Sequence, residues 1–236
     1  MNPIIKYAKP IFEERVKNLG FYGRKIPEVY EFYRLMDGFI QTFAILGHKR
    51  CFGVSFGVYP LCNCVTGGGG GIPSSVITGE QITDYKMMFV DKYIEEEVIR
   101  ATNLMLKEFE LHVLPWLEGN DTIEKAYQSI SDLLPAFGEK PDFYWMMQMG
   151  KLEKAIEALE LQIAEEDRMK ADALSNPVYS MLHSKEQIAD LVDFHNQTLE
   201  SLNRLRNYLI KGGMDYLNYY VEKSTEKTLA NLKLTK

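Results

Sequence analysis

The chain has 236 residues, of which 46% are hydrophobic and 25% are charged, and its formal net charge is −6. This composition can bury a core, so a disordered or fibrous chain is excluded. Acidic residues outnumber basic ones, so the chain lacks the excess of Lys and Arg that is typical of nucleic-acid-binding proteins. No apolar run is long enough to cross a membrane. Three cysteines are too few for a disulfide framework, so we expect a cytoplasmic protein.

The first part of the chain is predicted to fold as a helix followed by a small sheet. Apolar residues recur at helical spacing up to Leu19, and Gly20 is a natural helix terminator. Asp37-Gly38 is the strongest hairpin signal in the chain, because both central positions of a type I′ turn need positive φ. We expect three or four antiparallel strands, at residues 29–36, 39–46, 52–58 and, as the fourth, 85–90.

The third predicted strand alternates clearly between large and small residues. Large apolar residues occupy the even positions from 52 to 58, with Gly53, Ser55 and Gly57 between them, so the small residues should share one face. Residues 53–57 also match the G-x-S-x-G pattern of hydrolases, in which the serine stands on a sharp turn between strand and helix. The alternation runs through the motif and no helix follows it. We therefore interpret Ser55 as an ordinary strand residue.

Four residues around this strand have the right chemistry for zinc, namely His48, Cys51, Cys62 and Cys64. If the chain is extended from Cys51 to Cys62, its ends are ~35 Å apart, and only a fold-back at Pro60 could bring the four together. We expect no metal, and we interpret the cysteines as small hydrophobic residues.

The segment Gly67–Gly71 consists of five consecutive glycines. Such a run is costly to order, so we expect it to be the most mobile internal segment. An anion-binding nest of backbone N–H groups is the alternative interpretation. No lysine follows the run before Lys86, so it is not a Walker loop.

The second half of the chain has a helical pattern. Pro115 is expected to end the first helix of this half. Ser184 and Gln187 have the spacing of a capping box that opens a long helix, and Gly212-Gly213 should stop that helix.

The long helix at residues 185–210 carries apolar residues at alternating steps of three and four, which form one seam. We expect this seam to pair with a last helix at residues 214–232, with a second copy of the chain, or with both. The predicted fold class is therefore α+β, with an α+β domain at residues 1–175 and a C-terminal helical hairpin at residues 176–236.

A series of short motifs between about residues 10 and 165 has a recognisable order. The motifs are Leu19-Gly20-Phe21, Phe32-Tyr33-Arg34, Asp37-Gly38, Ile40-Gln41, Val54-Ser55-Phe56-Gly57-Val58, Leu114-Pro115-Trp116-Leu117, Met149-Gly150 and Ala155. This order resembles the bacterial family catalogued as domain of unknown function 4304. The resemblance implies an α+β domain with a small antiparallel sheet and supplies no catalytic residues. Some relatives look like small immunity-type proteins that block a partner toxin.

The leading functional hypothesis is a protein-binding module, with an immunity-like role as its most specific form. The alternative is a small-ligand or anion-binding domain that uses a groove beside Gly53, Ser55 and Gly57, with Gly69 in a lid. An enzyme ranks third, because every catalytic motif has a simpler structural interpretation. We predict no cofactor, and we expect a protein partner and a homodimer through the C-terminal helices rather than nucleic acid or a membrane.

Overall fold

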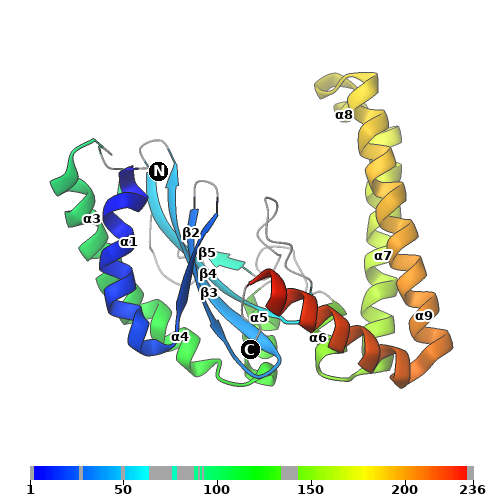
Figure 1. Cartoon of the computed structure of the whole chain (residues 1–236). Helices are drawn as coiled ribbons and strands as arrows, with labels where there is room; N and C mark the ends of the chain where they lie inside the picture. Colours follow the sequence, from blue (N-terminus) through cyan, green and yellow to red (C-terminus); the bar gives the residue numbers. More distant parts are fainter. Residues whose placement is uncertain are drawn as a thin grey trace. The chain divides into compact units, whose positions relative to one another are not determined.

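The computed structural model describes residues 3–26, 29–48, 51–63, 76–78, 88–89, 91, 93–133 and 143–232. The elements shown in Figure 1 are α1 Pro3–Val16, β1 Tyr22–Ile26, β2 Val29–Leu35, β3 Phe39–His48, β4 Cys51–Pro60, β5 Val76–Thr78, β6 Met88–Phe89, α3 Glu95–Glu108, α4 Leu114–Gly119, α5 Ile123–Leu133, α6 Phe143–Gln148, α7 Leu152–Ser175, α8 Pro177–Leu182 and α9 Lys185–Asn231.

The chain divides into two compact units, which we call the sheet unit and the helical unit. The sheet unit is Met1–Pro141 together with Ser224–Lys236, and the helical unit is Asp142–Lys223. The predicted domain boundary after residue 175 stays a prediction, because packing within one chain does not test which part folds independently.

The sheet is antiparallel, with the strand order β1-β2-β3-β4-β5 and with β6 paired to β4. The predicted α+β class, with an antiparallel sheet and long C-terminal helices packed as a hairpin, is confirmed, and the two helices of this hairpin are α7 and α9. Gly38 between β2 and β3 has a φ of 80°, as the predicted hairpin turn requires. The sequence pattern does not indicate β1, which pairs with β2 so that Arg24 lies opposite Glu31.

Helices α1 and α3 cover one face of the sheet, which we call the first face (Figure 1). Its centre is aromatic: the ring of Phe12 lies 5.9 Å from that of Phe43 and 6.1 Å from that of Phe109. Phe32 stacks on Phe43, with 4.5 Å between ring centroids. These rings are buried, so the first face carries the main core of the sheet unit.

A buried glutamine ties the sheet to the turn between α4 and α5. Nε2 of Gln41 donates to the carbonyl oxygens of Leu117 and Asn120, at 2.5 and 2.8 Å. Nη2 of Arg34 donates to Oε1 of Gln41 at 2.6 Å. The Gln41 side chain, which is fully buried, is thus hydrogen-bonded at both of its polar ends, as a buried amide requires.

The helix that begins at Glu95 does not end at Pro115, which corrects the sequence prediction. A π-helical turn at Phe109–Val113 follows α3 and leads directly into α4, which includes Pro115. The N–H of Leu114 bonds to the carbonyl of Phe109, a wider spacing than in an α-helix. This local change of register lets the helix continue past a residue that has no N–H to donate.

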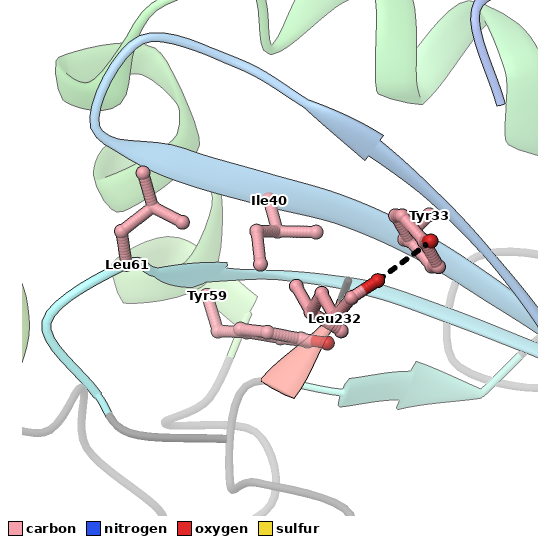
Figure 2. Close-up of a cluster of buried hydrophobic side chains, with 5 residues drawn as sticks. All are labelled: Tyr33, Ile40, Tyr59, Leu61 and Leu232. Atoms are coloured by element: carbon pink, nitrogen blue, oxygen red, sulfur yellow. Dashed lines mark hydrogen bonds between the residues drawn. The ribbon is translucent and has the colours of Figure 1, made fainter. Parts of the chain in front are cut away.

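The opposite face of the sheet, which we call the second face, holds a smaller apolar cluster (Figure 2). Leu232, which follows the last turn of α9, is surrounded by four residues of this cluster: Tyr33, Ile40, Tyr59 and Leu61. The hydroxyl of Tyr33 donates to the carbonyl oxygen of Leu232 at 3.1 Å. The last turn of α9 and Leu232 are therefore part of the sheet unit.

In the helical unit, the long helices α7 and α9 pack side by side (Figure 1). Their contact includes a hydrogen bond between Oε1 of Glu166 and Nδ1 of His195, at 2.6 Å. At Gly213 the backbone leaves helical geometry, so the range Lys185–Asn231 holds two helices that meet at a kink, as Gly212-Gly213 predicted. The segment 185–210 packs on α7, which the sequence analysis did not name among its expected partners.

Candidate functional site

The residues proposed for a ligand groove lie in a regular strand. Gly53, Ser55 and Gly57 belong to β4, which pairs with β3 on one side and with β5 on the other. Strand alternation places these three positions on the second face, the face on which Leu232 packs. Because the strand runs straight through the motif, Ser55 does not stand on the strand-to-helix turn that a hydrolase nucleophile needs. Gly69 and the glycine run lie outside the described residues.

The metal candidates are spread along the same strand. His48 lies opposite Cys51 at one end of the β3–β4 hairpin. Cys62 is buried just beyond the other end of β4, and nine extended steps separate the strand's ends by ~30 Å. Cys64 lies outside the described residues. Among the residues that the structure describes, no three His, Cys, Asp or Glu side chains are grouped to hold a metal ion.

The second face carries a polar cluster beside the Leu232 contact. Nε of Arg24 and Oε2 of Glu31 are 2.6 Å apart, and both side chains are mostly buried. Burial raises the pKa of the Tyr59 hydroxyl, the charge of Glu31 raises it further, and Arg24 opposes the rise. Burial also raises the pKa of Tyr33. Tyrosine hydroxyls are protonated at neutral pH at their ordinary pKa, and these rises keep both phenols protonated in more alkaline solution as well.

An open hollow of about 520 Å³ lies beside the first turn of α7 in the helical unit. Its lining residues are Lys151, Leu152, Glu153, Lys154 and Met214. The hollow has two basic residues and a helix N-terminus, but Glu153 offsets one of the positive charges. It is formed by residues that the sequence analysis did not select.

The most unusual surface of the described chain is the apolar tip, which we define as Leu174, Val178, Met181 and Leu182. These four side chains are 64%, 54%, 82% and 72% exposed, respectively. Three of them belong to α8, where the spacing i, i+3 and i+4 puts them on one face. Helix α8 contains no buried residue, so its apolar face is turned to solvent.

Hydrogen bonds at its ends, and not burial of its side chains, stabilise α8. The Asn176 side chain accepts a hydrogen bond from the N–H of Val178 at 3.0 Å, and Pro177 occupies the first helical position. The predicted capping box that opens α9 is confirmed: Ser184 and Gln187 bond reciprocally, at 2.9 and 3.2 Å. A six-residue helix is unstable alone, so the Asn176 cap at its start and the bond from the His183 N–H to the Tyr179 carbonyl at its end stabilise α8.

Sequence reasoning did not identify the apolar tip. The only signal is Val178, Met181 and Leu182 at helical spacing between two capping motifs. Periodicity shows that such residues share a face, but it does not show whether another element covers that face.

Comparisons with protein-family models, with curated proteins and with solved structures found no match. None of the helices in the described part of the chain is both long and apolar enough to span a membrane. The geometry of the molecule is therefore the basis for its functional interpretation.

Proposed function

We propose that the protein is a protein-binding module that inserts the apolar tip into a groove on a partner protein. The observation that carries this proposal is that α8 has a side-chain cap, Asn176, at its N-terminus and yet buries none of its residues. Contiguous exposed apolar side chains of this kind mark interaction surfaces on monomeric proteins.

The size of the tip indicates the kind of partner. Four such side chains form a patch on the order of 500 Å², as large as the largest apolar patch of a typical monomer. A stable interface needs about 800 Å² from each partner, so two tips facing each other fall short of a stable dimer. A short convex helix with anchors at i, i+3 and i+4 instead matches helix-in-groove recognition. We therefore propose a different protein with a concave apolar groove.

The polar surroundings of the tip support this arrangement. His183, Lys185 and Glu186 follow α8 directly and are exposed. Charges of both signs around an apolar centre are typical of the rim of a protein interface. An immunity-like role, in which the groove belongs to a toxin, is the most specific form of the proposal and rests on the family resemblance. The alternative ligand site beside Gly53, Ser55 and Gly57 rests on the sequence alone.

The proposal is tested by affinity capture from cells that naturally make the protein. The double variant Met181→Asp, Leu182→Asp replaces two exposed anchors by charges and should leave the fold intact, because neither residue is buried. It should lose more than about 90% of the captured partner, since desolvating a charge in an apolar groove costs several kcal/mol.

The matched control is Leu161→Asp, a change of the same type at a position of α7 that is 56% exposed and lies outside the tip. The control should capture the partner as the wild type does. Equal capture by the wild type, the control and the double variant would show that the tip is not the binding surface.

A further inference from the structure

Helix α9 carries a second row of side chains beside the row that it buries. The buried row includes His195, which contacts α7, and Leu202. The second row, which we call the outer stripe, consists of Leu191, Phe194, Thr198, Ser201, Leu205 and Tyr208. Phe194 is 61% and Tyr208 49% exposed, Ser201 is exposed, and the other three are partly exposed. Alternating steps of three and four residues place all six along one side of α9.

We propose that the outer stripe is the interface of a homodimer in which two copies of α9 pack antiparallel about a twofold axis. The occupant is a second copy of the chain because the stripe is complementary to itself when its direction is reversed. This proposal uses a different surface from the apolar tip and does not depend on it.

The sizes of the side chains follow the same order from either end of the outer stripe. Large residues occupy both ends, and the small residues Thr198 and Ser201 occupy the centre. With the twofold axis between these two, Phe194 of one copy lies opposite Leu205 of the other, and the outermost residues of the stripe meet in the same way. Small side chains at the crossing point let two helices approach closely, and the large ones fill the space on both sides. An isologous interface requires this kind of self-complementarity.

The polar groups at the centre of the outer stripe already have partners within α9. The Thr198 hydroxyl donates to the Phe194 carbonyl oxygen at 3.0 Å, and the Ser201 hydroxyl donates to the Gln197 carbonyl oxygen at 2.9 Å. A hydroxyl is costly to bury only when it loses its hydrogen bond. A second helix can therefore cover these two residues without leaving either hydroxyl unsatisfied.

The charges beside the outer stripe favour the antiparallel orientation. Asp190, Arg204 and Lys211 are exposed and follow one another at multiples of seven residues, so they lie on one side of the stripe. Arg204 also pairs with Glu200 within α9. In an antiparallel pair, Asp190 of each copy approaches the basic end of the other copy, whereas a parallel pair keeps the acidic ends together. The opposed helix dipoles favour the same orientation.

The size of the outer stripe indicates how strong the dimer is. Six side chains from each copy bury on the order of 1,000 Å² in total, which is the size of weak, reversible protein pairs. We therefore expect a dissociation constant on the order of 10–100 μM, because larger interfaces of about 1,600 Å² already include micromolar ones.

The first test is sedimentation equilibrium of the full-length chain from about 1 to about 500 μM, which brackets the expected dissociation constant. The mass should rise from the 27.2 kDa of one chain towards twice that value. Phe194→Glu should weaken the dimer more than about tenfold, since it places a charge in the apolar interface.

The matched control is Leu161→Glu, at a position of α7 that is 56% exposed and lies outside the outer stripe. It should dimerise as the wild type does, and so should the tip variant Met181→Asp, Leu182→Asp. A wild type that stays a single chain over the whole range would overturn the proposal, as would a Phe194→Glu variant that dimerises like the control.

The second test determines the orientation by mixing Phe194→Glu with Leu205→Lys. Each variant alone should be monomeric, because both of its 194–205 layers set a charge against an apolar residue. In the mixture, one layer pairs the introduced carboxylate with the introduced ammonium group, and the other keeps Phe194 against Leu205, so dimers should return. Two folded variants that stay monomeric when mixed contradict the antiparallel arrangement. If circular dichroism shows that Leu205→Lys is unfolded, the comparison of Phe194→Glu with Leu161→Glu decides alone.

Discussion

Glu166 on α7 and His195 on α9 form a polar contact between the two helices, with 2.6 Å between Oε1 and Nδ1. The His195 side chain is 4% exposed and the Glu166 side chain 13% exposed. A carboxylate with so little solvent depends on its hydrogen-bond partner, because an unpaired buried charge is strongly unfavourable. The pair therefore constrains how the two helices can pack.

We predict that His195→Leu lowers the free energy of unfolding by about 1–3 kcal/mol, because it leaves the Glu166 carboxylate without this partner. Urea denaturation followed by circular dichroism measures the loss. The double change Glu166→Leu, His195→Leu should recover part of the stability, since it removes both polar groups.

A matched control for this pair is Glu200→Gln, which breaks the exposed ion pair between Glu200 and Arg204 on α9. Surface pairs contribute little, so this variant should stay within about 0.5 kcal/mol of the wild type. A His195→Leu variant as stable as the control would show that the buried pair does not stabilise the contact between α7 and α9.

Among the elements, the kink of α9 has a clear origin in two adjacent glycines. Gly213 has φ 57° and ψ −141°, a conformation that essentially only glycine adopts. A Cβ atom on Gly212 would lie 2.5 Å from the Cβ of Tyr216, so this position also excludes a side chain. The two glycines were predicted to stop the first helix, and the backbone does leave helical geometry at Gly213 before the next helix begins.

We predict that Gly213→Ala lowers the free energy of unfolding by about 1–3 kcal/mol, because alanine is strained at this φ and ψ. The control is Gly119→Ala, where an added Cβ meets no atom within 4 Å. The control should be neutral or slightly stabilising, since alanine restricts the unfolded chain. Thermal unfolding of both variants makes the comparison, and equal melting temperatures would mean that the kink is not a fixed feature.

The elements that the sequence predicted well are those with a strong local signal. Strand β4 alternates over its whole length, and the Ser184 capping box needs only residues within one turn. β1 has no such signal, because Gly23, Arg24 and Lys25 lie at its centre and its pairing with β2 depends on residues elsewhere in the chain. The continuation past Pro115 depends on the π-helical turn before it, which periodicity does not indicate.

At the scale of the whole molecule, the candidate site was less predictable than the fold. The sequence motifs predicted a site at Gly53, Ser55 and Gly57, whereas the apolar tip lies mainly on α8. Exposure depends on which elements come together in space, and no local pattern encodes it. The same limitation applies to the partner of residues 185–210, because a seam of apolar residues does not specify which helix will cover it.

The two tryptophans of the chain report on the two units separately. Trp116 belongs to the sheet unit, where its ring lies 5.6 Å from that of Phe56, and Trp145 is fully buried in the helical unit.

We predict that Leu202→Glu lowers the unfolding midpoint reported by Trp145 and leaves that reported by Trp116 nearly unchanged. Leu202 is buried on α9, and an unpaired charge there costs several kcal/mol. Fluorescence of Trp116→Phe and Trp145→Phe variants, each with and without Leu202→Glu, separates the two signals. Equal shifts at both probes would show that the sheet unit and the helical unit unfold as one cooperative body.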